Sequence, residues 1–382
     1  ATPLHAADET APKHGAAEAA TQRAADEDTR ETTRARMGRI FESMQVLLPL
    51  SVDEAAFAAT ENREKVRRAL ETVASNADAV SRHARQDDVG RRFLGRSLHE
   101  DASRALARYD EGRTENAAFL VRQATENCIA CHTKLASPGD SPRAANFVSE
   151  TDLSRLPLGE RARLLIATRQ FDAAETALEQ LVTDSATPPS QLLPALTDYL
   201  VVAMRVKGDY ARPIPTLEKV AARPDLWSRL QEDVQQWIRS LRALAAGSEA
   251  KPGLAAARQR IEKARTLVPY PADNAGLVEY VYASGLLHAF LETDPASRKD
   301  ASEAWYLLGV TESETARGFW VSEAALYLEA AIRTDPKAPS AKKAYDLLEE
   351  GIMLDYSGSA GVNVPYAERQ RLAELRGLID AK

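Results

Sequence analysis

The chain has 382 residues, a net charge of −7 and only two cysteines. Its length exceeds what one hydrophobic core usually serves, so we expect two domains or one domain with a repeat array. Charges of both signs are mixed along the chain, which argues against a nucleic-acid-binding protein. The longest apolar run, around 199–204, is short and flanked by charge, so no membrane span is predicted.

The composition favours helices. Alanine, leucine, arginine and glutamate dominate, and alternation of β-branched residues at period two is almost absent, so the predicted fold class is all-α. Residues 1–28 offer little to bury and are expected to form a disordered leader. The numbering starts at Ala1 rather than Met, which fits a chain whose secretion signal has been removed.

Four amphipathic helices are expected within residues 29–137. The first carries an apolar stripe that includes Met37, and it is expected to stop at Pro49. The second follows Asn62, and Thr114 is expected to cap the fourth. Because short loops join the helices, an antiparallel four-helix bundle is the simplest way to bury their apolar stripes.

A linker is expected at 138–150, followed by helical pairs over 151–382. A signature of turn, aromatic residue and helix occurs at 169–181 and again at 207–220. The clearest unit comprises Trp305, Leu308, Gly309, Ala324, Leu328, Ala331 and Pro336, with a longer loop than usual between its halves. This order resembles the tetratricopeptide repeat, and the resemblance implies stacked helical pairs that dock a protein partner on a concave surface.

Four tryptophans occur in the chain, and each is expected to pack in the core rather than to bind a partner. They are Trp227, Trp237, Trp305 and Trp320.

The stretch ENCIACHTKL contains Cys128, Cys131 and His132. On one helix these side chains share a face, as haem attachment needs, because two thiolates add across the porphyrin vinyl groups while the histidine reaches the iron. A thioredoxin-like dithiol needs a preceding strand, and a structural zinc site needs a second pair of ligands; the sequence indicates neither. One covalently attached haem c is therefore predicted.

The motif follows a long helical region, and this arrangement resembles class II c-type cytochromes, the cytochrome c-prime family. In that family a four-helix bundle carries Cys-x-x-Cys-His on its last helix, and the segment RMGRIFESM at 36–44 looks like the family's opening. The resemblance covers about residues 29–137. It implies that Cys128 and Cys131 are the thioether anchors and that His132 is the proximal iron ligand.

The residue on the opposite side of the iron separates the possible functions. Met37 matches the position from which low-spin members of the family supply a methionine, and such a ligand reserves the haem for electron transfer. The alternatives are an open apolar distal face or a histidine such as His99 or His83. The chain departs from the family pattern after the motif, where Leu135 and Ala136 replace an aromatic and a basic residue.

The leading functional prediction is a periplasmic or otherwise exported monohaem electron carrier of bacterial type. Its repeats are expected to bind a redox protein or a second copy of the chain. The alternatives are a five-coordinate haem sensor or carrier of a diatomic gas, and a scaffold in which the haem stabilises the bundle. No P-loop, GxSxG, HExxH or Rossmann glycine pattern occurs, so no enzyme site beyond the haem is expected.

Overall fold

The computed structural model describes residues 14–84, 89–134, 139–140, 153–247, 253–268, 274–315, 323–359 and 361–381. Helices dominate these residues, which confirms the predicted all-α class. The strands β1 (Ser357–Gly358) and β2 (Gly361–Val362) form one short antiparallel hairpin.

The elements before the linker are called the N-terminal helices: α1 (His14–Val52), α2 (Glu54–Ala58), η1 (Thr60–Asn62), α3 (Arg63–His83), α4 (Val89–Asp110), α5 (Thr114–Gln123) and α6 (Thr125–His132). The elements after it are called the helical array: η2 (Leu153–Arg155), α8 (Leu158–Ala167), α9 (Phe171–Thr183), η3 (Pro189–Gln191), α10 (Leu192–Leu200), η4 (Val201–Val206), α11 (Pro213–Ala221), α12 (Ser228–Ala246), α13 (Leu254–Leu267), α14 (Leu277–Glu292), α15 (Arg298–Thr315), α16 (Glu323–Thr334), α17 (Pro339–Asp355) and α18 (Tyr366–Asp380).

Both ends of α1 differ from the prediction. The helix begins at His14, inside the segment expected to be a disordered leader, because alanine, glutamate and arginine are strong helix formers. It also continues through Pro49 to Val52 instead of stopping at the proline. Pro49 lacks the N–H that would donate to the Gln45 carbonyl, so the helix loses one hydrogen bond there, and it ends three residues later. Residues 1–13 lie outside the described part of the chain.

The predicted fourth helix is broken into α5 and α6 at Ala124. The Thr125 hydroxyl donates to the carbonyl of Arg122 at 2.6 Å, and the Asn127 N–H donates to the Ala124 carbonyl at 3.2 Å. Bonds of this kind replace the regular helical ladder and bend a helix. As a result, α1 packs on α3 and α5, whereas α6 packs on α4 and α8.

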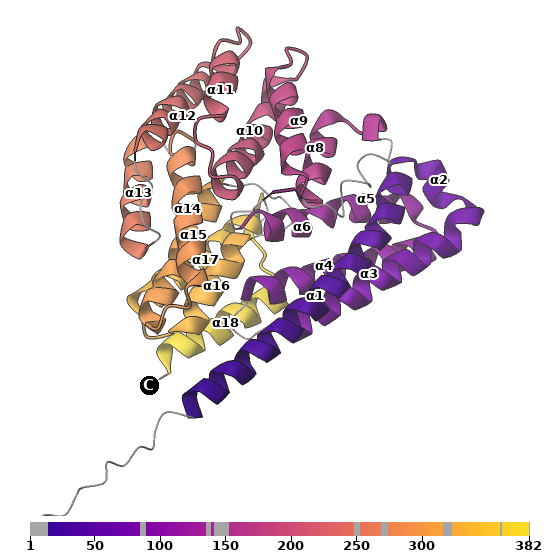
Figure 1. The fold of residues 1–382 in the computed structure, drawn as a ribbon, viewed down its shortest axis with the longest axis horizontal. Coiled ribbons are helices and arrows are strands. Elements are labelled where there is room, and N and C mark those ends of the chain that lie inside the picture. Colours follow the sequence, from indigo (N-terminus) through magenta and orange to yellow (C-terminus); the bar gives the residue numbers. More distant parts are fainter. Residues whose placement is uncertain are drawn as a thin grey trace, which may run out of the picture.

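The helical array is a curved succession of packed pairs: α8 with α9, α11 with α12, α13 with α14, α15 with α16, and α17 with α18. In Figure 1 this succession forms an arc, and α6 lies on its inner side, between α8 and α4. Within the α15–α16 pair, a Cβ added to Gly309 would come within 2.5 Å of the Leu328 side chain. The glycine therefore permits the close approach of these two helices.

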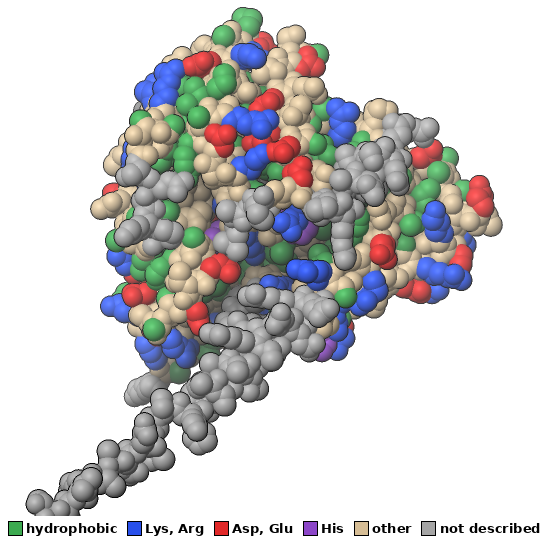
Figure 2. Space-filling model, in the orientation of Figure 1, with side chains coloured by type: hydrophobic (Ala, Val, Ile, Leu, Met, Phe, Trp, Pro, Cys, Tyr) green, Lys and Arg blue, Asp and Glu red, His purple; other side chains and the backbone are tan. Residues whose placement is uncertain are grey.

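The described core is continuous across the two parts of the chain. One cluster of buried side chains extends from Ile40 on α1 to Tyr327 on α16, and a smaller cluster joins α16, α17 and α18. On the surface, Lys and Arg side chains alternate with Asp and Glu side chains over the visible face of the array (Figure 2). The charge pattern of that face matches the mixed-sign sequence.

The tryptophans differ in burial. Trp237 is fully buried and its indole N–H donates to the Asn274 carbonyl at 2.7 Å, which confirms the prediction for this residue. Trp305 is half-buried and stacks on Tyr327, with ring centroids 5.6 Å apart. The prediction is wrong for Trp227, which is 47% exposed because it precedes α12 as its N-cap residue and lies outside the helical face. Trp320 lies outside the described residues.

Candidate cofactor-attachment site

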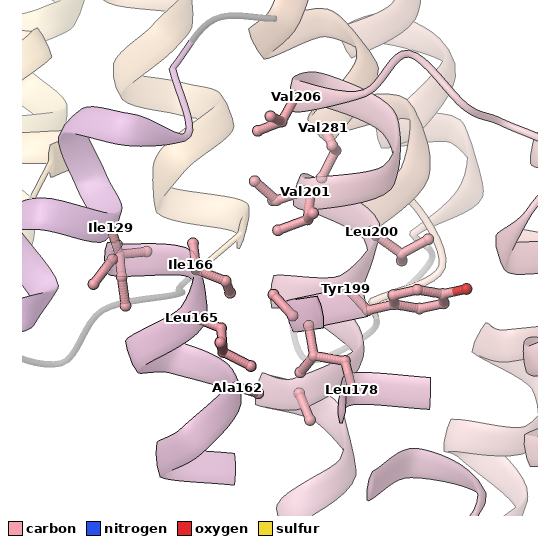
Figure 3. Close-up of a cluster of buried hydrophobic side chains, with 14 of the residues drawn as sticks. Ile129, Ala162, Leu165, Ile166, Leu178, Tyr199, Leu200, Val201, Val206 and Val281 are labelled. Carbon is pink, nitrogen blue, oxygen red and sulfur yellow. The ribbon is translucent and has the colours of Figure 1, made fainter. Parts of the chain in front are cut away.

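The motif helix α6 is anchored by its apolar residues. Ile129 is buried and points towards Leu165 and Ile166 of α8 (Figure 3), while Ala130 packs against Leu94 of α4. Ile129 and Ala130 lie between the two cysteines, so their burial fixes the orientation of the helix. The face of α6 that carries Cys131 points away from the core, and Cys131 is exposed.

His132, the last residue of α6, bonds to a backbone group of the helical array. Its Nδ1 atom lies 2.8 Å from the carbonyl oxygen of Ala167, at the end of α8. Because a carbonyl oxygen only accepts, the proton of the neutral ring belongs on Nδ1, and Nε2 keeps its lone pair. Burial lowers the pKa of His132 to about 4, and Arg169 contributes in the same direction. The ring is therefore neutral near pH 7, which is the form that ligates metals.

The two cysteines differ in exposure and are not joined by a disulfide. Cys128 is half-buried, and burial, with a smaller contribution from Cys131, raises its pKa to about 12. Reactive dithiols in exchange enzymes have lowered pKa values instead. The environment of Cys128 therefore argues against a thiol–disulfide exchange role for this pair.

The histidines and the methionine considered for the other side of the iron lie elsewhere. Met37 is half-buried on α1, a helix that packs on α3 and α5. The Nδ1 atom of His99 lies 2.9 Å from the Ala74 carbonyl of α3, and His83 is exposed at the end of α3. The structure thus groups Cys128, Cys131 and His132 on one helix without bringing any of these three candidates into a described contact with them.

Sequence reasoning missed the contacts that follow His132. The Thr133 carbonyl accepts from Arg205 Nε at 2.7 Å, and Lys134 Nζ lies 5.5 Å from the ring centroid of Tyr327. Arg205 had one visible signal, because it is the charge at the end of the longest apolar run. A charge in such a run indicates a buried pair, but no local pattern identifies the partner.

Cys128, Cys131 and His132 are of the donor types that attachment of a haem c requires. Among the described residues, no three His, Cys, Asp or Glu side chains converge to hold a metal ion. In a c-type haem the porphyrin supplies four nitrogen ligands to the iron, and the protein supplies two thiols and one neutral imidazole. The imidazole with a backbone acceptor on Nδ1 has the second-shell bond typical of ligating histidines.

Comparison with known proteins provides no further assignment. No protein-family model, no curated protein and no solved structure matches the chain. Within the described ranges, none of the helices combines the length and apolar character needed to cross a membrane.

Proposed function

We propose that this chain is a monohaem c-type cytochrome that acts as an electron carrier. Cys128 and Cys131 would form the two thioether bonds, and His132 would supply the proximal nitrogen. The observation that carries the proposal is the bond between His132 Nδ1 and the Ala167 carbonyl, which leaves Nε2 as the ligating atom. When bound, the haem supplies an iron that alternates between two oxidation states.

The residues around the motif would hold the ligand in one orientation. The Ala167 carbonyl fixes the tautomer of His132 and increases the basicity of Nε2. Ile129 keeps α6 packed on α8, so the anchors and the ligand retain their spacing. A rigid environment of this kind limits the reorganisation that accompanies a change in charge.

The proposal includes export and a protein partner. Haem attachment of this type takes place outside the cytoplasm in the family that the sequence resembles. The array, which resembles tetratricopeptide repeats in sequence, would contribute the partner surface.

A test of the proposal is haem attachment itself. The full chain is expressed with a secretion signal in a bacterium that attaches c-type haem, and the denatured protein is weighed by mass spectrometry. We expect the wild type to carry the mass of one haem and the Cys128→Ala/Cys131→Ala variant to carry none. His83→Ala, which changes an exposed histidine, is the matched control and should keep the haem. A wild-type chain of unmodified mass would refute the proposal.

A second candidate is a haem protein with an open sixth position that binds a diatomic gas. It is favoured by the observation that α1, which carries Met37, packs on α3 and α5 while α6 packs on α4 and α8. Absorption spectra of the reduced protein with and without carbon monoxide separate the two. No change on adding carbon monoxide supports the electron carrier, and ready binding supports the gas-binding protein.

A further inference from the structure

Three consecutive residues at the end of the motif contact the helical array. His132 bonds to α8 through the Ala167 carbonyl, Thr133 accepts from Arg205 of η4, and Lys134 lies over the Tyr327 ring of α16. The side chains of Thr133 and Arg205 are both buried. The segment that would carry the iron ligand is therefore held by elements that are distant in sequence.

Arg205 is the charged residue in this set, and its charge is compensated inside the array. Its side chain is 2% exposed, and Nη1 donates to Glu312 Oε1 at 2.7 Å and to Ser284 Oγ at 2.9 Å. Thr315 donates to the second oxygen of Glu312 at 3.1 Å. Buried charges are tolerated when they are paired and hydrogen-bonded in this way.

The geometry of the guanidinium turns this pair into a positional restraint. Its donors form a rigid planar fork, so binding Glu312 and Ser284 through Nη1 fixes the direction in which Nε points. Nε points at the Thr133 carbonyl, 2.7 Å away. Arg205 itself lies in η4, a π-helical segment that follows α10, and π-helical turns are frequent at functional sites.

We propose that Arg205 is a positioning residue for the Cys-x-x-Cys-His segment. It holds the carbonyl of Thr133, the residue that follows His132, and the Ala167 carbonyl holds the imidazole, so the two restraints together keep one ring orientation. This inference rests on the proposed haem function. It assigns to the helical array the task of setting the geometry of the iron ligand, in addition to any partner binding.

The test compares Arg205→Gln with Arg223→Gln in the full chain. Arg223 is the matched control because it is also a buried arginine of the array, donating to the carbonyls of Val182, Asp184 and Thr187, but it does not contact the motif segment. Electron paramagnetic resonance of the haem-loaded proteins should show one haem species in the wild type and in Arg223→Gln. It should show more than one in Arg205→Gln.

A second measurement does not need the haem. In the Cys128→Ala/Cys131→Ala background, hydrogen exchange is followed in the peptide that covers residues 125–134. Arg205→Gln should accelerate exchange there by about tenfold, as expected for the loss of one buried charged hydrogen bond, and Arg223→Gln should not. Should Arg205→Gln fail to fold, Glu312→Gln weakens the same restraint, and Arg205→Lys should restore part of the protection.

The outcomes separate the two proposals. Equal exchange and equal spectra for Arg205→Gln and the wild type would overturn the positioning role, as would the same changes in Arg223→Gln. A wild-type chain that attaches no haem would overturn the proposed function, while the exchange comparison would still decide whether Arg205 holds the segment.

Discussion

Met37 and Met44 lie two turns apart on α1 but differ in their surroundings. Met44 is 7% exposed and belongs to the described core, whereas Met37 is half-buried and packs at the edge of that core. A thioether in the core contributes mainly by filling space. Met37 is therefore less enclosed by the core than Met44.

Met37→Ala tests the predicted sixth ligand. We expect the variant to lose the low-spin absorption spectrum and to bind carbon monoxide when reduced, because alanine has no donor atom. Met44→Ala is the control, and it should lower the stability while leaving the spectrum unchanged. An unchanged spectrum in Met37→Ala would remove this residue from the site.

Glu175 on α9 is a carboxyl group that is removed from water. Arg212 Nη1 lies 2.8 Å and Lys207 Nζ 3.3 Å from its Oε2 atom. Burial nevertheless raises the pKa of Glu175 to about 7, against the opposing effect of Arg212 and with further raising contributions from Glu179 and other carboxylates. The group therefore changes its charge near neutral pH.

Glu175→Gln should make the stability of the protein less dependent on pH. The folded protein holds this proton more tightly than the unfolded chain, whose pKa is near 4.5. The stability that this proton contributes is complete below that value and is lost as the pH rises through about 7. Between about pH 5 and about pH 8, the free energy of unfolding of the variant should rise relative to that of the wild type. The rise should be a few kcal/mol at most, since one pKa unit is about 1.4 kcal/mol.

Urea denaturation at both pH values measures this effect. Glu218→Gln, at an exposed glutamate that pairs with Arg242, is the control and should follow the wild-type pH profile. Parallel profiles for Glu175→Gln and the wild type would show that Glu175 is ionised in the folded protein across this range.

The sequence predicted that the two cysteines and His132 share one helix, because their relation is local. Cys128, Cys131 and His132 are within four positions of each other, and helical periodicity is enough to place them on one helix. The hydrogen-bond acceptor of His132 could not be predicted in this way, because every residue carries a carbonyl and Ala167 is 35 positions away. Nothing in the sequence distinguishes that carbonyl from its neighbours.

At the scale of the elements, Asp140 connects the segment after the motif to the array through hydrogen bonds. Its Oδ1 atom accepts from the backbone N–H groups of Phe171 at 2.6 Å and Asp172 at 3.2 Å. These N–H groups begin α9, where the helix has no internal acceptors for them. A residue from the segment predicted to be a linker thus caps a helix that starts 31 positions later.

Asp140→Ala should lower the free energy of unfolding by about 1 kcal/mol, the usual effect of losing a helix cap. Urea denaturation measures the change. Asp140→Asn is the matched control, because an asparagine oxygen also accepts from these N–H groups, and it should retain most of the stability. Equal stability of Asp140→Ala and the wild type would mean that α9 is not capped from this position.

Helix positions were predicted better than helix ends. The stripe of α3 follows Asn62 as expected, since periodicity over many residues is a strong signal. The break at Ala124 was missed because the periodic pattern does not show whether a threonine will bond to a carbonyl of the preceding turn, as Thr125 does to Arg122. Pro49 was given too much weight, because a proline removes one helical hydrogen bond but need not end the helix at its own position.

At the scale of the whole molecule, the described parts before and after the expected linker share one core. Ile129 is 4% exposed and packs among side chains of the array, although it belongs to α6. All four tryptophans lie in the sequence after the linker. Tryptophan fluorescence therefore reports on the array, whereas a change at Ile129 acts from the N-terminal helices.

We expect one unfolding transition, with the same midpoint by tryptophan fluorescence and by helical circular dichroism. Ile129→Ala should lower the stability by about 2–4 kcal/mol and shift both signals together, because it removes buried contacts between the two parts. Phe119→Ala, at an exposed residue of α5, is the control and should leave both midpoints in place. If Ile129→Ala left the midpoint measured by fluorescence unchanged, the two parts of the chain would unfold separately.

The sequence indicated two kinds of helical organisation, and the order of the helices could be read from it. It did not indicate how the two parts lie against each other, because that arrangement depends on pairs such as Glu126 of α6 with Arg163 of α8, which are 37 positions apart. Each member of such a pair looks like an ordinary charged residue until the partner is placed beside it.

The packing of Ile129 against the side of α8 that carries Leu165 and Ile166 also predicts how such a chain can vary during evolution. Interiors are close-packed, so a larger or smaller side chain at 129 needs a compensating change in its neighbours. Substitutions at 129 should therefore co-vary with those at 165 and 166 across relatives, even though position 129 lies inside the Cys-x-x-Cys-His motif. The identity of residue 129 should therefore depend on the helical array against which the motif helix packs.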